Sequence, residues 1–152
     1  MKQEFSAGGV VYKRKAGSVK GEVEILVSQH SGHHGWVFPK GFIGDKIEGE
    51  SKEETALREV KEETGARGEI IEALTPVDYW YQIDEERHHK TVYYFVMKYL
   101  DGDITQHDWE MENVEWLPID EVKNRLTFPS DKKVWREAKA WLMAHGVLHM
   151  EK

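Results

Sequence analysis

Residues 51–64 constrain the fold of this chain more than any other stretch, because they read as a helix with both ends marked. Ser51 can cap the first turn, and Glu54 three residues later completes a capping box. Gly65 follows the last periodic residue, where a helix commonly ends in a left-handed residue. The chain must therefore build a core that receives one face of this helix.

Three carboxylates share one side of the predicted helix. Each helical residue advances by about 100°, so Glu59, Glu62 and Glu63 fall within an arc of roughly 100°. The apolar side chains of Ala56 and Val60 point to a neighbouring side. The same short helix can thus pack into a core and present an acid cluster.

Crowded carboxylates need a positive partner, since like charges four residues apart destabilise an isolated helix by about 0.2–0.5 kcal/mol. Arg58 lies one turn before Glu62 and one turn after Glu54, but one guanidinium cannot neutralise the whole cluster. Mg²⁺ or Mn²⁺, which prefer oxygen ligands, would supply the missing charge. A solvated acidic helix with ordinary ion pairs is the alternative interpretation.

The rest of the chain alternates predicted strands and helices. Strands are expected at residues 5–13, 23–29, 68–74, 77–83, 91–100 and 114–117, and further helices at 118–126 and 130–145. Residues 30–49 read as a glycine-containing loop interrupted by the apolar stretch 36–38. No linker or repeat divides the chain, so we expect a single α/β domain over residues 1–152, with a mixed sheet and helices on its faces.

Composition narrows the class of protein. The 152 residues carry 28 acidic and 21 basic side chains, and a formal charge of −7 disfavours binding of duplex nucleic acid. The absence of cysteine excludes disulfides, thiolate zinc sites and thiol nucleophiles. No segment resembles a membrane span or a signal peptide, so we expect a cytoplasmic protein without a membrane partner. The sequence does not indicate the oligomeric state.

The predicted helix and its surroundings resemble the signature of the Nudix hydrolase family, G-x5-E-x7-R-E-U-x-E-E-x-G-U, where U is aliphatic. The matching residues are Gly44, Glu50, Arg58, Glu59, Val60, Glu62, Glu63, Gly65 and Ala66. The segments SAGGVVYK, WVFPKG and TVYYFVMKY and the last helix have family counterparts in the same order. The resemblance implies the Nudix fold, an α/β/α sandwich with a mixed central β-sheet, and a metal-dependent pyrophosphohydrolase.

The resemblance also implies roles for the acidic motif. Glu59, Glu62 and Glu63 would bind Mg²⁺ or Mn²⁺. Arg58 would orient these carboxylates through hydrogen bonds, and Glu50 would contact a metal through water.

The resemblance implies two further metal ligands, each with more than one candidate residue. The first is a glycine backbone carbonyl. Gly44 precedes Glu50, the first glutamate of the motif, by six residues, whereas Gly41 of the PKG segment precedes it by nine. Three residues are therefore inserted between PKG and the motif, and either glycine is a candidate. A distant loop acid also serves as ligand or general base in relatives. Glu110 is our candidate, with Glu112 and Glu115 as competitors and a solvated loop acid as the alternative.

The segments WVFPKG, YWYQ and KTVYYFVMKY most resemble the diadenosine polyphosphate hydrolases of the family, in which lysines meet phosphates and aromatic rings stack on adenine. The resemblance assigns Lys40 and Lys90 to the phosphates, and Tyr79, Tyr81 or Tyr94 to the base. From their position beside Lys90 in the sequence, His88 and Arg87 are candidates for further phosphate contacts. Each tyrosine is alternatively a half-buried strand residue.

The reaction implied for this nucleotide substrate is asymmetric cleavage of diadenosine tetraphosphate to ATP and AMP. Other family members act on oxidised nucleoside triphosphates, ADP-ribose or other nucleotide sugars, and these substrates remain alternatives. A nucleotide-sensing binding module is a further alternative, although such modules usually lack part of the acid set that is intact here.

Overall fold

The computed structural model describes residues 1–44 and 46–148. Its elements follow one another as β1 (Lys2–Arg14), β2 (Val23–His30), β3 (Trp36–Val37), β4 (Lys40–Phe42), α1 (Lys52–Thr64), β5 (Ala66–Ala73), β6 (Val77–Ile83), β7 (Glu86–Gly102), the 3₁₀ helix η1 (Ile104–Gln106), β8 (Met111–Pro118), α2 (Ile119–Arg125) and α3 (Pro129–Ala144).

In the described residues, eight strands join in one sheet with β1 and β7 at its centre. These two strands run parallel, from Lys2 beside His88 to Tyr12 beside Lys98, and the other strand pairs are antiparallel. The other edge of β1 pairs with β4 at the middle of β1 and with β2 at its end. The sheet is therefore mixed, as predicted.

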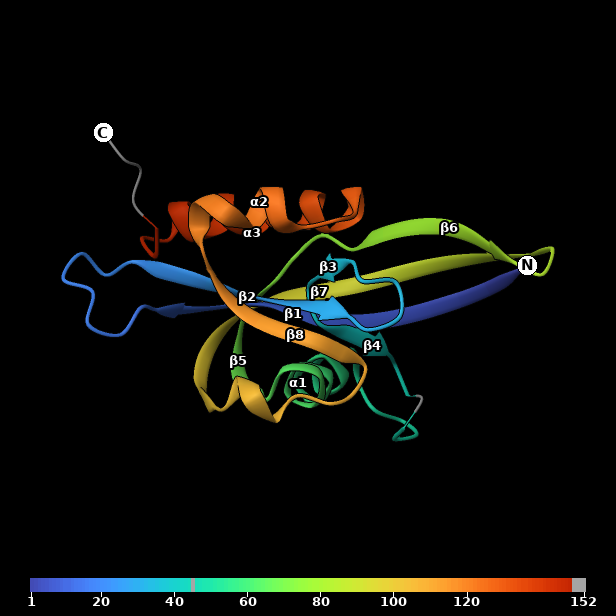
Figure 1. Ribbon diagram of the computed structural model, residues 1–152. Coiled ribbons are helices and arrows are strands. Elements are labelled where there is room, and N and C mark those ends of the chain that lie inside the picture. Colours follow the sequence, from blue (N-terminus) through green and yellow to red (C-terminus); the bar gives the residue numbers. More distant parts are fainter. Residues whose placement is uncertain (45, 149–152) are drawn as a thin grey trace.

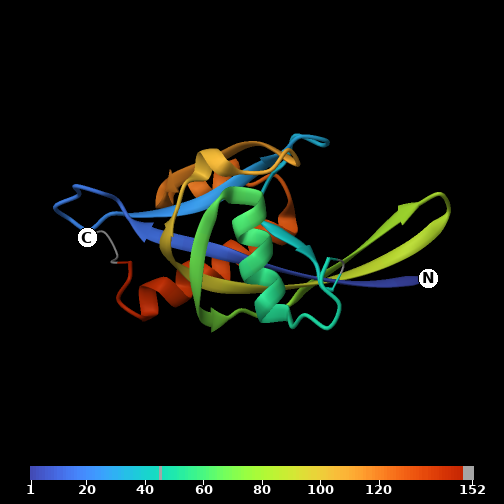
Figure 2. The same cartoon turned by 90° about the horizontal axis from the view of Figure 1, so that it is seen from below.

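The helices lie on opposite faces of the sheet, with α1 on one side and α2 and α3 on the other (Figure 1). Beneath α1 the core contains Ala56, Val60 and Met97, and beneath α3 it contains Val10 and Trp135. The predicted α/β/α sandwich is confirmed. Toward the N-terminus, β1, β6 and β7 extend past the helices as an arm of the sheet, which Figure 2 shows from the α1 side.

Helix α1 has the ends that its sequence predicts. The Ser51 hydroxyl accepts from the Glu54 amide at 3.1 Å, and the Glu54 carboxylate accepts from the Ser51 amide at 3.2 Å. Gly65 follows with φ of 83°, a left-handed conformation that glycine adopts without a Cβ clash.

Residues 30–49 are not all loop, because this stretch contains β3 and β4. β3 pairs with β2, and β4 pairs with β1 at Ser6–Gly8. These strands are two and three residues long, so their extended form comes from pairing partners distant in sequence rather than from local propensity. Similarly, β7 begins at Glu86 instead of residue 91, since pairing with β1 and β6 prolongs it.

None of the described helices combines the length and the hydrophobicity that a membrane span requires.

Candidate active site

Arg58 lies among three carboxylates on α1 and the loop before it. Its guanidinium donates to Glu50 at 2.8 and 2.9 Å, to Glu59 at 3.0 Å and to Glu62 at 3.1 Å. The pairing with Glu50 is the main cause of the raised pKa of Arg58. The structure therefore brings three of the acidic motif residues together around the one motif arginine.

Lys46, which the sequence analysis did not single out, adds a second cation to this cluster. Its ammonium lies 2.7 Å from the Glu62 carboxylate. In the part of the chain that the structure describes, no three Asp, Glu or His side chains converge with the spacing of metal ligands. The arginine and the lysine occupy positions among the carboxylates, so a bound metal would require Glu62 to exchange partners.

Glu59 and Glu63 point from α1 toward the sheet and are both buried. Burial raises the pKa of Glu63 well above its usual range, and the charges of Glu59 and Asp108 raise it further. Burial likewise raises the pKa of Glu59. Burial thus disfavours the charged form of both carboxylates, although Arg58 pairs with Glu59, and a hard cation that takes oxygen ligands would stabilise that form.

The two candidate glycines lie in different surroundings. Gly41, in β4, abuts the Glu59 carboxylate so closely that a Cβ at this position would overlap it. Gly44 lies in an open turn with φ of 75°. The backbone of Gly41 thus lies beside the acid cluster, although the family spacing favours Gly44.

The two lysines of the predicted phosphate site lie on the other face of the sheet. Lys40 pairs with Gly8 and Lys90 with Glu4, so both side chains project to the α3 face. Burial, together with the charge of Lys40, lowers the pKa of Lys90 to about 8. The Lys40 amide meanwhile donates to Glu63 at 3.1 Å, which connects the lysine face to the acid cluster.

The aromatic candidates divide into two groups. Tyr79 and Tyr81 lie on the same face as the lysines with their rings 6.3 Å apart, and both are half-buried. Tyr94 is buried in the core, where its ring packs edge-on against Phe38 and its hydroxyl donates to Asp131 at 3.5 Å. The expectation that Tyr94 stacks on a base is therefore corrected, because both of its faces lie inside the protein.

His88 is also largely enclosed, and its ring stacks on Tyr81 at 4.7 Å. Its Nδ1 lies 3.1 Å from the Glu4 carboxylate, which also accepts from the Tyr81 hydroxyl. The structure thus places His88 close to Lys90 but already engaged with a carboxylate.

The loop acids differ in their partners. Glu112 pairs with His34, and Glu115 pairs with Arg125 at 3.0 Å, whereas Glu110 is half-buried and its amide donates to Asp108. Asp108 was missed by sequence reasoning, yet its charge acts on Glu63 and its amide donates to the Glu62 carbonyl at 3.1 Å. No local pattern distinguishes Asp108 from the other acids of this loop.

Comparison with known proteins identifies the fold and the motif together. A family model described as the NUDIX domain matches residues 4–138. The chain belongs to the NUDIX domain family. The resemblance noted in the sequence is confirmed, and the acid helix α1 is the Nudix motif helix.

Curated relatives of this Nudix domain differ in their named activities. The protein named MutT4 of Mycobacterium tuberculosis is 39% identical over 86% of this chain, and an 8-oxo-(d)GTP phosphatase of Mycolicibacterium smegmatis is 32% identical over 89%. The chain spans 52% and 41% of those two proteins. An asymmetrical bis(5'-nucleosyl)-tetraphosphatase of Rattus norvegicus is 31% identical over 79% of this chain and is itself covered over 81%.

Solved structures confirm the Nudix fold. An Ap4A hydrolase of C. elegans in a binary complex is 24% identical in sequence and superposes with a TM-score of 0.66. The match covers 93% of this chain and 98% of the hydrolase chain. The Nudix domain of Shewanella oneidensis NrtR complexed with ADP ribose is 22% identical and superposes with a TM-score of 0.71. The match covers 93% of this chain and 90% of the NrtR chain.

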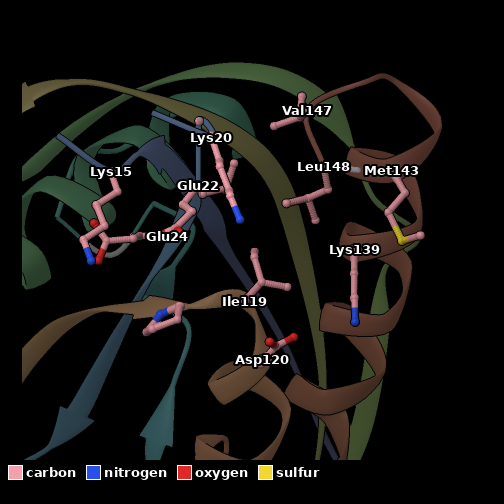
Figure 3. A pocket seen from close by; sticks show the side chains of 13 residues that line it. Lys15, Lys20, Glu22, Glu24, Ile119, Asp120, Lys139, Met143, Val147 and Leu148 are labelled. Carbon is pink, nitrogen blue, oxygen red and sulfur yellow. The ribbon is translucent and has the colours of Figure 1, made fainter. Parts of the chain in front are cut away.

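One large cavity lies away from the Nudix motif. It has a volume of about 700 Å³ and is formed between the β1–β2 hairpin, α2 and the end of α3 (Figure 3). Lys20, Ile119 and Leu148 are among its lining residues, and none of the predicted site residues lines it. The candidate active site is instead the region around β4, between the acid helix and the lysine face.

Proposed function

We propose that the protein is a divalent-metal-dependent pyrophosphohydrolase of nucleotides, with diadenosine tetraphosphate, cleaved asymmetrically to ATP and AMP, as the leading substrate. The observation that carries this proposal is the placement of β4. Gly41 lies against the acid cluster, while Lys40 of the same strand lies beside Lys90 on the opposite face. A polyphosphate that crosses this strand would meet the acid cluster, where a metal would bind, and then two ammonium groups.

The residues present fit a Mg²⁺ or Mn²⁺ ion in their chemistry. Glu59 and Glu63 supply buried carboxylates that lack full compensation, and Glu62 would join them on leaving Lys46. Gly41 is the favoured source of a backbone carbonyl. When bound, the ion would neutralise phosphate charge and acidify a water. Arg58, anchored by Glu50, would hold the orientation of the carboxylates.

The remaining roles go to residues that surround this path. Glu110 stays our candidate for the loop acid, with Asp108 as a new competitor because its charge reaches Glu63. Tyr79 and Tyr81 present neighbouring rings on the lysine face, and each ring that stacks on a base contributes about 1–3 kcal/mol. That residues 1–152 form a single hydrolase domain stays a prediction.

Oxidised nucleoside triphosphates are the second candidate substrate class. The relative named as an 8-oxo-(d)GTP phosphatase aligns over most of the chain, which favours this class. Both candidates would use the metal and the lysines in the same way, because both carry a polyphosphate chain. They differ in what the aromatic side chains must recognise.

The deciding experiment is turnover of a nucleotide panel with Mg²⁺, with the products resolved by ion exchange. We expect ATP and AMP from diadenosine tetraphosphate; two molecules of ADP would refute asymmetric cleavage. Lys90→Ala should raise the KM for this substrate more than the KM for ADP-ribose, whereas Lys98→Ala, an exposed lysine of the same strand, should change neither. If the protein hydrolyses 8-oxo-dGTP but not diadenosine tetraphosphate, its substrates are oxidised nucleoside triphosphates.

A further inference from the structure

Residues 38–41, which we call the strap, connect the two faces of the sheet at the proposed site. Three backbone groups of the strap are held by three different elements. The Phe38 amide donates to Asp131 of α3 at 3.2 Å, the Pro39 carbonyl accepts from Gly9 of β1 at 3.1 Å, and the Lys40 amide donates to Glu63 of α1 at 3.1 Å. The strap is thus fixed from both helical layers and from the sheet between them.

Of these anchors, Asp131 is not used by the proposed reaction. It lies in the first turn of α3 with 4% of its surface exposed, and the same carboxylate oxygen that accepts from Phe38 also accepts from the Tyr94 hydroxyl. Burying a carboxylate is unfavourable unless it is hydrogen-bonded or paired. Lys40, whose charge acts on Asp131, supplies the opposite charge from within the strap.

The neighbouring contacts show how little freedom the strap has. The Trp36 amide, just before the strap, donates to the Thr127 hydroxyl at 2.8 Å, and the Thr127 amide donates back to the Trp36 carbonyl. At the other end, Gly41 is in contact with the Glu59 carboxylate. A displacement at Phe38 would therefore move Lys40 and Gly41, because these residues follow it directly along the chain.

We propose that Asp131 is a positioning residue that acts through the strap: by accepting the Phe38 amide it fixes where Lys40 meets phosphate and where Gly41 meets the metal site. This inference rests on the proposed function for its effect on turnover. The hydrogen bond, rather than the charge, is the part that positions the strap.

Two variants separate the hydrogen bond from the charge. Asp131→Asn keeps an oxygen acceptor of the same shape, and we expect its kcat to remain within about twofold of the wild type. Asp131→Ala leaves the Phe38 amide without its acceptor, and we expect at least about a tenfold loss of kcat because catalytic groups are sensitive to small displacements. Asp131→Ser provides the same test if the alanine variant does not fold.

The matched control is Glu137→Ala. Glu137 also lies on α3 and accepts a backbone amide, that of Thr75 at 2.6 Å, but it has no contact with the strap in the described residues. We expect it to lower thermal stability without changing kcat. A loss of kcat equal to that of Asp131→Ala would show that any loosening of α3 has this effect, and would overturn the proposal.

A second readout does not depend on any substrate. Amide hydrogen exchange of Phe38 and Lys40 should accelerate at least about tenfold in Asp131→Ala and remain unchanged in Asp131→Asn. Unchanged exchange in the alanine variant, or equal losses of kcat in both variants, would overturn the proposal. If the wild type hydrolyses no nucleotide, the proposed function fails, but the exchange rates still test the strap.

Discussion

Glu50 and Glu63 are buried carboxylates of one motif, and their surroundings are opposite. Glu50 accepts from Arg58 and, at 2.7 Å, from the Thr55 hydroxyl, and the arginine lowers its pKa. Glu63 accepts from one backbone amide, and among residues 1–44 and 46–148 no side-chain cation lies within ion-pair distance of it.

This difference separates two uses of the same side chain. The Glu50–Arg58 pair is complete within the protein, so it supports the fold and orients its neighbours. Glu63 has no such partner, and burial disfavours its charged form, which is the condition that a bound cation would correct. We therefore interpret the first end of the motif as mainly structural and the second as the side that would hold a metal.

The largest effect expected from this comparison is the loss of the structural pair. Arg58→Ala would leave Glu50 buried without its main partner, and removal of one member of a buried pair costs about 3–5 kcal/mol of unfolding free energy. Urea denaturation measures this loss. Arg67→Ala, which breaks an exposed pair with Asp101, should leave the midpoint unchanged. Equal midpoints for the two variants would contradict a structural role for Arg58.

Glu63→Gln tests the other end of the motif. We expect kcat to fall by at least about 10²-fold, because a charge-stabilising group is lost while the shape is kept. Without metal, the same variant should be more stable than the wild type at neutral pH, since the raised pKa of Glu63 means that its ionisation opposes folding as pH rises. Glu69→Gln, at an exposed acid, is the control. Normal kcat in a folded Glu63→Gln protein would exclude Glu63 as a metal ligand.

A bound divalent cation should supply the positive charge that the buried glutamates lack, and so stabilise the folded protein. We expect chelator to abolish activity, and Mg²⁺ at about 100 times its Kd to raise the unfolding free energy of the wild type by about 2.7 kcal/mol. Thermal unfolding with and without the ion measures this gain, which should be much smaller in Glu63→Gln. Full activity in chelator would refute the metal mechanism.

The smallest expected effect concerns Lys90, a half-buried cation on the opposite face. Its pKa of about 8 means that the ammonium is lost above this pH, so kcat/KM should decline at higher pH by up to about tenfold per unit. Stability should rise between pH 8 and the usual lysine range, because there the unfolded chain binds the additional proton. Lys90→Arg should flatten the decline of kcat/KM; an unchanged profile would remove Lys90 from substrate binding.

Much of the acid helix was accessible from sequence because its information is local. The capping box, the left-handed Gly65 and the shared arc of the three glutamates follow from helix geometry, and the structure confirms the first two directly. The alternation of predicted strands and helices, together with the Nudix signature, also predicted a mixed sheet with helices on both faces. The short strands β3 and β4 escaped prediction, since their form depends on partners far along the chain.

Side-chain partners were the part that sequence could not resolve. Three tyrosines looked equivalent as base-stacking candidates, but the packing of Phe38 and α3 encloses Tyr94 and leaves the other two half-buried. Asp108 and Lys46 carried no motif, and the fold alone brings their charges to the acid cluster.

By itself, the sequence determined the family, the acid helix and the types of ligand available, because each depends on residue identity at short, fixed spacing. Only the tertiary structure decided that Arg58 pairs mainly with Glu50 and that Gly41, rather than Gly44, contacts the acid cluster. It also decided that β4 places Gly41 beside the acid cluster and Lys40 on the face that carries Lys90. These facts depend on the pairing of β4 with β1 and on the two helical layers, and long-range pairing leaves no local pattern in the chain.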